Sequence, residues 1–228
     1  MKCWICNHEA ESGEHLVKAS DIKGYFGDIS QNKPIYFHND EKRNVKIGSA
    51  KSKIFTSKAL ICKKCNNELS QPYDKAWEKL SSYLRDNWHI IKKSKKLNLS
   101  KIFPGEVRRQ SINIQLFFVK LFGCRVAEHE IPINLSGFSA SLINSESNKD
   151  IFLVFGETPV NLKAKKYICL TPVHCLDNKK ESLGAIWIYT IGDVSIKVMY
   201  SPIVKKGNAL GNAWHPFNKS KIMKLGKI

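Results

Sequence analysis

Two pairs of cysteines, separated by a long stretch of chain, constrain this sequence more than any other feature. Cys3 and Cys6 form one Cys-x-x-Cys pair, and Cys62 and Cys65 form the second. Two intervening residues let both thiolates of a tight turn reach one metal ion, and two such pairs complete the tetrahedral shell that Zn²⁺ prefers. The sequence therefore predicts a four-cysteine zinc site that ties the start of the chain to a segment far along it.

Two other interpretations of the cysteine pairs compete with a zinc site. A thioredoxin-like redox pair is disfavoured because neither pair lies between a clear strand and the helix of a βαβ unit, and chance spacing is the remaining alternative. The other three cysteines are scattered, and we expect them to behave as small hydrophobic residues: Cys124, Cys169 and Cys175.

The charge of the chain points to a polyanionic partner. Its 228 residues include 37 Lys and Arg against 20 Asp and Glu, which gives a formal net charge of +17. Such an excess attracts nucleic acid or acidic lipid, although a solvated lysine-rich exterior would give the same composition. A basic stretch from Glu41 to Lys64 is the candidate surface for backbone phosphates, with a solvated loop as the alternative. Its candidate nucleic-acid-binding residues are Lys42, Arg43, Lys46, Lys51, Lys53 and Lys58.

Membrane association is not expected. No apolar run approaches the roughly 20 residues that a membrane span requires. The first residues also lack the apolar stretch of a secretory signal. We therefore expect a soluble, cytoplasmic protein with no membrane partner.

Hydrophobic spacing predicts an α+β protein in two parts. A helix should follow the second cysteine pair, because Trp77, Leu80, Leu84, Trp88 and Ile91 recur at spacings of three and four. Lysine-rich residues 92–101 suggest a polar linker, so we expect domains at 1–103 and 104–228. The second domain should be a mixed α+β accessory unit for DNA binding or oligomerisation. It should contain a helix from Val107 that ends at Gly123, and strands near 151–155, 167–170, 186–189 and 194–200.

Polar residues beside the two cysteine pairs form the set that could carry chemistry. Glu14 and His15 lie between the pairs, while Asn66 and Asn67 follow the second pair directly and Asp74 lies a little further on. This set, in this order, resembles the HNH endonucleases of the zinc-knuckle type. The resemblance implies a ββα-metal fold over residues 1 to about 90, clamped by zinc on the four cysteines. It also implies a metal-dependent DNA endonuclease that acts in restriction, phage defence or mobile-element biology.

The resemblance assigns a role to each residue of the set. His15 would be the general base that activates water, and Glu14 and Asn66 would hold one divalent cation. Oxygen ligands of this kind suit Mg²⁺ or Mn²⁺. Asn67 could replace Asn66, and Asp74 is a supporting residue or an additional ligand. Ser57 stands where the family has the central Asn that orients the histidine, and the segment between His15 and Asn66 is longer than in compact members.

Each residue also has a plainer interpretation. His15 could be a surface histidine or a zinc ligand, Glu14 an exposed acid, and Asn66 and Asn67 helix caps. Two other functions therefore stay open, a non-catalytic zinc-ribbon protein that binds nucleic acid and an HNH-type nuclease that acts on RNA. A homodimer is expected if the enzyme cuts both DNA strands, since that needs two active sites.

Overall fold

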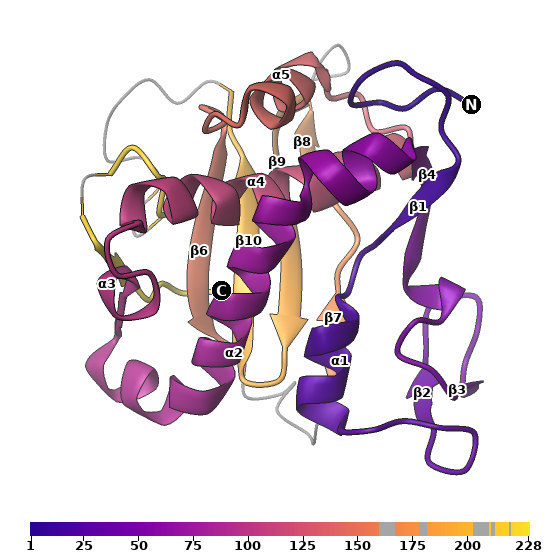
Figure 1. The fold of residues 1–228 in the computed structure, drawn as a ribbon, viewed down its shortest axis with the longest axis horizontal. Coiled ribbons are helices and arrows are strands. Elements are labelled where there is room, and N and C mark those ends of the chain that lie inside the picture. Colours follow the sequence, from indigo (N-terminus) through magenta and orange to yellow (C-terminus); the bar gives the residue numbers. More distant parts are fainter. Residues whose placement is uncertain (160–166, 178–181, 203–209, 211–212, 219) are drawn as a thin grey trace.

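An antiparallel sheet with two long helices against one face forms the centre of the fold (Figure 1). The sheet has the order β6-β10-β9-β7, and β8 pairs with a further part of β9. The structure is a computed structural model that describes residues 1–228 except 160–166, 178–181, 203–209, 211–212 and 219. The strands of the sheet are β6 (Ile151–Glu157), β7 (Ile168–Leu170), β8 (His174–Asp177), β9 (Ser182–Ile191) and β10 (Val194–Tyr200).

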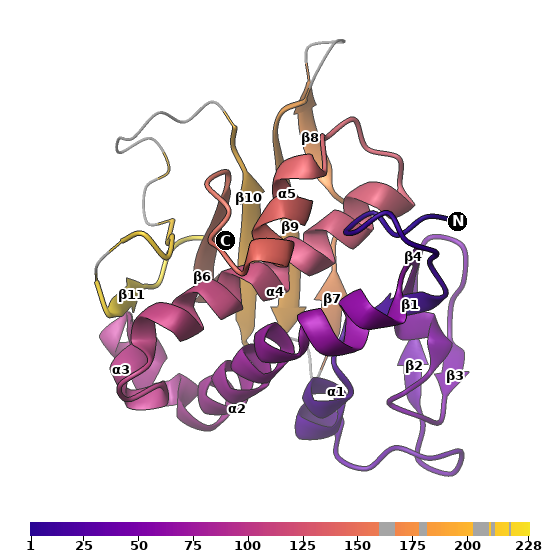
Figure 2. The same cartoon turned by 45° about the horizontal axis from the view of Figure 1, so that its top comes forward.

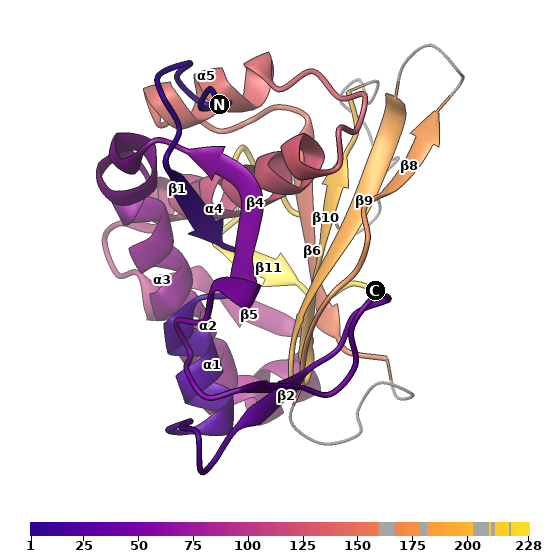
Figure 3. The same ribbon diagram turned by 90° about the vertical axis from the view of Figure 1, so that its right-hand side faces the viewer.

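The first part of the chain builds a small layer of its own beside the helices (Figure 3). Strands β1 and β4 form an antiparallel pair, and β2 and β3 form another. A π-helical segment, η2, connects β4 to the long helix α2. These elements are β1 (Ser12–His15), α1 (Ala19–Phe26), β2 (Ile35–Phe37), β3 (Val45–Ile47), η1 (Lys53–Phe55), β4 (Thr56–Ile61), η2 (Lys64–Leu69) and α2 (Gln71–Ser94).

Helix α4 crosses α2 and lies between β4 and the sheet (Figure 2). It contacts α2, β4, α5 and β6, so it joins the two layers. The elements that complete the described fold are β5 (Lys96–Asn98), α3 (Leu99–Ile102), α4 (Val107–Glu128), α5 (Ser136–Asn144) and β11 (Ile222–Lys224).

The predicted apolar stripe of α2 is confirmed as core. All five of its residues are buried, and Trp77 is among the largest fully buried side chains. Its ring stacks on Phe117 of α4 with centroids 5.1 Å apart and meets Tyr189 of β9 edge-on at 5.7 Å. Aromatic pairs of this geometry add to the stabilisation from burial. The α+β class and the predicted strands of the second half are confirmed as well.

The predicted linker at residues 92–101 is wrong. Helix α2 continues to Ser94, and β5 and α3 follow it without an unstructured stretch. Leu97, Leu99 and Ile102 are buried because β5 pairs with β11, where Leu97 faces Met223. One hydrophobic cluster contains residues from both sides of residue 104. The division of the chain at that residue stays a prediction.

The predicted end of α4 at Gly123 is also wrong, because the helix continues to Glu128. The glycine serves packing rather than termination. A Cβ atom at this position would lie 2.3 Å from the nearest ring atom of Trp4. Only glycine lets the segment between the first two cysteines approach α4 this closely.

None of the helices in the described part of the chain combines the length and the apolar character needed to cross a membrane.

A buried carboxyl group joins α1, α2 and the sheet. Asp21 is 0% exposed, and its Oδ2 accepts hydrogen bonds from Trp77 Nε1 at 2.8 Å and from the Tyr189 hydroxyl at 3.4 Å. Burial raises the pKa of Asp21 because the charged form loses its hydration, although the hydrogen bonds partly oppose this. The folded protein therefore holds the Asp21 proton more tightly than the unfolded chain does.

This linkage predicts how replacing Asp21 changes the pH dependence of stability. Above the unfolded pKa of about 3.8, the folded state binds more protons at Asp21, so its contribution to stability falls as pH rises through the folded pKa. In Asp21→Asn, the free energy of unfolding, measured with urea at a series of pH values, should fall less steeply with pH between the unfolded and the folded pKa of Asp21. Each pKa unit of the difference corresponds to about 1.4 kcal/mol. The exposed Asp86→Asn variant is the matched control, and an identical slope in both variants would contradict the prediction.

Candidate functional site

The four paired cysteines come together as the sequence predicts. The sulfur atoms of Cys3, Cys6, Cys62 and Cys65 all lie within 4.8 Å of one another. Thiolates around a tetrahedral zinc ion lie about 3.8 Å apart, because each Zn–S bond is about 2.3 Å. The donor set and its spacing therefore fit a zinc ion, which these four residues could hold. His15 is not part of this group.

The backbone of each pair forms the tight turn that such a site needs. In the first turn, the N–H of Cys3 donates to His8 O and the N–H of Asn7 donates to Cys3 O, both at 2.8 Å. Asn7 has φ 63°, a left-handed conformation that Asn tolerates better than most residues. In the second turn, the N–H of Cys65 donates to Cys62 Sγ at 3.4 Å. Burial alone would raise the pKa of Cys62, but this bond and the neighbouring thiols outweigh it and lower the pKa.

Strands β1 and β4 place the Glu-His pair beside the cysteines. Gly13 faces Leu60 and His15 faces Thr56, and the register shifts between these two pairs. Irregularities of this kind change the direction of a side chain on a strand and are frequent next to active sites. A Cβ atom on Gly13 would lie 2.9 Å from the carbonyl oxygen of Ser57, so the close approach of the two strands requires glycine.

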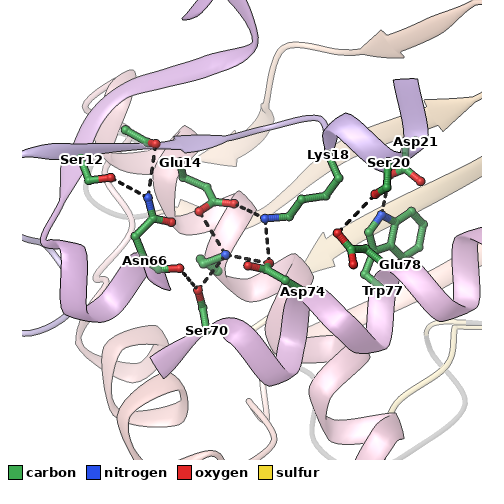
Figure 4. A network of polar contacts seen from close by, with 12 residues as sticks. Ser12, Glu14, Lys18, Ser20, Asp21, Asn66, Ser70, Asp74, Trp77 and Glu78 are labelled. Atoms are coloured by element: carbon green, nitrogen blue, oxygen red, sulfur yellow. Dashed lines mark hydrogen bonds and ion pairs between the residues drawn. The ribbon is translucent and has the colours of Figure 1, made fainter. Parts of the chain in front are cut away.

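Glu14 is buried in a network of two carboxylates and two lysines (Figure 4). Its Oε1 lies 2.9 Å from Lys18 Nζ, and its Oε2 lies 3.0 Å from Lys120 Nζ. Asp74 Oδ1 accepts from the same two ammonium groups, at 2.8 and 2.9 Å. Glu14 is therefore not an exposed acid, and both of its oxygens already carry an ion pair.

Lys120 is the least expected member of the network, because its side chain is 0% exposed. Its third hydrogen bond goes to Ser70 Oγ at 3.0 Å, which satisfies every N–H of the ammonium group. Burial by itself would lower the pKa of Lys120, but the ion pairs with Glu14 and Asp74 outweigh this and raise it. The buried lysine is therefore charged at neutral pH.

Asn66 joins the start of η2 to β1. Its Nδ2 donates to Ser12 Oγ at 2.7 Å and to Gly13 O at 3.4 Å, while its backbone oxygen accepts from Ser70 Oγ at 2.7 Å (Figure 4). The side chain thus fixes β1 to η2 and does not cap α2. Asn67 is exposed, and no hydrogen bond joins its side chain to another of the described residues.

His15 is half-buried at the end of β1, next to Glu14 in sequence. Its Nδ1 is buried and has no hydrogen-bond partner among the described residues. Burial lowers the pKa of His15, and the charges of Lys18 and Lys51 act in the same direction, whereas Glu14 opposes them. The neutral imidazole is thus favoured. It can accept a proton from a group that approaches it.

Ser57 has a hydrogen-bond partner other than His15, the partner that the HNH resemblance implies for its position. It is buried in β4, and its hydroxyl donates to Glu128 Oε2 at 3.1 Å. The same carboxylate accepts from Lys58 N and from Arg125, so it ties α4 to β4. In the described residues, no hydrogen bond joins Ser57 to His15.

The six candidate nucleic-acid-binding residues are all exposed. They lie on the segments around β2, β3 and β4, on the side of the molecule that Figure 3 turns toward the viewer. Within the described part of the chain, none of the six forms an ion pair with an acidic side chain, so their charges remain available to phosphate: Lys42, Arg43, Lys46, Lys51, Lys53 and Lys58.

Lys18, Lys120, Ser12 and Ser70 contribute to the site without having been predicted. A usable signal exists for Lys120 alone, because it interrupts the apolar run from Leu116 to Phe122 in α4. A lysine inside such a run is almost never buried unless it is paired. The signal predicts a partner but does not say which carboxylates it meets.

Comparisons of the chain with protein-family models, curated proteins and solved structures found no match. The functional argument therefore depends on the residues and their geometry.

Proposed function

We propose that this protein is a metal-dependent DNA endonuclease of the HNH type. The observation that carries the proposal is that Glu14 and His15 lie on β1, which pairs with the strand that leads into the second cysteine pair, while Asn66 Nδ2 donates to Gly13 O of the same strand. Two antiparallel strands, β1 and β4, and the helix that follows them have the order expected of a ββα-metal unit. A zinc ion on the four cysteines would hold this unit together, as the sequence resemblance implies.

In this proposal, His15 takes the proton of the attacking water. Its half-buried imidazole at the end of β1, which is favoured in the neutral form, suits a general base. Glu14 and Asn66 would hold one Mg²⁺ or Mn²⁺, and Asp74 would add a carboxylate beside Glu14, with which it shares Lys18 and Lys120. Oxygen donors of this kind suit a hard cation. The two lysine ammonium groups that contact Glu14 and Asp74 indicate that these carboxylates stabilise positive charge. When bound, the cation would stabilise the charge of the phosphodiester transition state.

DNA is the substrate that the charge distribution supports. The six exposed basic residues lie on β3, on β4 and on the segments before them, and the start of β4 faces His15. Cations that neutralise several phosphates supply most of the affinity of non-specific DNA binding. Cleavage of a single strand needs one site, whereas double-strand cleavage would need a homodimer.

Incubation of the zinc-loaded protein with supercoiled plasmid tests the proposal. We expect nicking with added Mg²⁺ or Mn²⁺ and none without added cation. Omission of the cation is a better control than a chelator, which would also remove zinc. Total RNA should stay intact under the same conditions, and faster cleavage of RNA than of plasmid would instead identify a ribonuclease. Intact plasmid in every arm would contradict the proposal.

A second candidate function is a non-catalytic protein that binds nucleic acid. The observation that favours it is the pairing of both Glu14 oxygens with lysines, so that a metal ion would have to compete with an ammonium group for either oxygen. Plasmid that is retarded on a gel but not cut with either cation would support this function over the endonuclease.

A further inference from the structure

The two lysines at Glu14 and Asp74 differ in their surroundings, although they contact the same carboxylates. Lys120 comes from the middle of α4, is fully buried, and donates to three acceptors. Lys18 precedes α1, and its side chain retains 13% exposure. It donates to two acceptors only, Glu14 Oε1 at 2.9 Å and Asp74 Oδ1 at 2.8 Å. The ammonium of Lys120 therefore cannot move away from the two carboxylates without leaving a buried charge unpaired, whereas the ammonium of Lys18 can turn toward solvent.

The position of the Lys18 ammonium is the one that a cation held by both carboxylates would occupy. Its nitrogen lies within 2.9 Å of one oxygen of each group, and Asp74 is itself 20% exposed. Glu14 and Asp74 are held in place from the buried side by Lys120 whether Lys18 is present or not. Because Lys120 is fixed by burial and Lys18 is accessible to solvent, the Lys18 ammonium is the one that another cation could replace.

We propose that Lys18 is a resident cation that a divalent metal ion displaces from Glu14 and Asp74, while Lys120 stays in place as their permanent counter-charge. The displacement replaces a single positive charge with two, so the site gains one positive charge for a phosphodiester. It also frees the ammonium of Lys18 next to that phosphate. This inference rests on the proposed function for its biological meaning, but the exchange itself is a property of the free protein.

Binding of Mn²⁺ to the zinc-loaded full chain tests the exchange without any measurement of activity. Electron paramagnetic resonance of free Mn²⁺ gives the Kd, and the loaded cysteines keep Mn²⁺ out of the zinc site. In Lys18→Met the competing charge is gone and the apolar stem is kept, so we expect Mn²⁺ to bind about tenfold more tightly or better than in the wild type. Lys18→Arg retains the charge and should bind Mn²⁺ as weakly as the wild type does.

Two further variants identify the site. Lys23→Met removes an exposed lysine of α1 that has no contact with Glu14, and it should leave the Kd unchanged. Glu14→Gln in the Lys18→Met background should abolish the gain. Equal affinities in the wild type and Lys18→Met, or an equal gain in Lys23→Met, would overturn the inference. If Mn²⁺ affinity rises but plasmid stays intact, the exchange is supported and the endonuclease is refuted. If plasmid is cut but Mn²⁺ affinity does not rise, the endonuclease is supported and the exchange is refuted.

Discussion

Cys62→Ser should lose zinc and fail to fold in its first hundred residues. Zinc binding to four cysteines contributes about 10–16 kcal/mol in small zinc peptides, a magnitude that exceeds the whole stability of many domains. In this protein, Cys62 directly follows β4, and the four-cysteine cluster joins the end of β4 to the segment before β1. Without the metal, the two turns keep only weak connections, such as the contact between the Cys6 and Cys62 sulfur atoms at 3.4 Å and the exposed ion pair of Lys63 with Glu11 at 3.5 Å.

Elemental analysis and thermal unfolding followed by circular dichroism measure this effect. The wild type should contain one zinc per chain, and Cys62→Ser should contain none and melt at a much lower temperature. Cys169→Ser is the matched control, because Cys169 lies in β7 and is only partly buried. It should retain zinc. A folded wild-type protein without zinc would refute the zinc site itself.

His15→Ala should lower the rate of plasmid nicking by about 10²–10⁴-fold, the usual contribution of a general base. His15 is the only residue of the proposed set whose nitrogen is both buried and without a hydrogen-bond partner in the described part of the chain. Glu14 cannot substitute for it, because both of its oxygens are held by lysines. Single-turnover nicking with saturating protein separates this loss from any change in DNA affinity.

The exposed His89 on α2 provides the control, and His89→Ala should nick as fast as the wild type. Zinc content and DNA affinity of His15→Ala should stay near the wild-type values. If His15→Ala cuts as fast as the wild type, the base is another residue or the activity comes from a contaminant.

Short-range patterns in the sequence predicted most of the fold, whereas contacts between distant segments were missed. The cysteine spacing predicted the cluster because a metal site imposes a strict local geometry. The stripe from Trp77 to Ile91 predicted the buried face of α2 because helical periodicity is local. The lysine-rich composition of residues 92–101 predicts a linker, but these residues form β5 and α3. Strand β5 forms by pairing with β11, which is distant in the sequence, so local composition does not reveal it.

In the candidate site too, features that depend on short sequence spacings could be predicted, whereas contacts between distant segments could not. Glu14 and His15 were found from their spacing to the cysteines, and the bonds of Asn66 to Ser12 and Gly13 agree with its place beside them. The pairing of Glu14 with Lys120 joins residues on different elements, and no spacing rule relates them. A single sequence therefore indicated which groups carry the chemistry, but not which charges neutralise them.

The burial of Lys120 beneath Glu14 and Asp74 has a consequence for how this protein can change or be taken apart. The proposed ββα unit contains the four cysteines and Lys18, but Lys120, the fully buried one of the two lysines that pair with its carboxylates, comes from a helix beyond residue 104. A copy of the unit transferred to another protein would bring two facing negative charges with only the partly exposed Lys18 to pair with them. The two carboxylates and the helix that carries Lys120 therefore form one electrostatic unit, which transfer of the first hundred residues alone would divide.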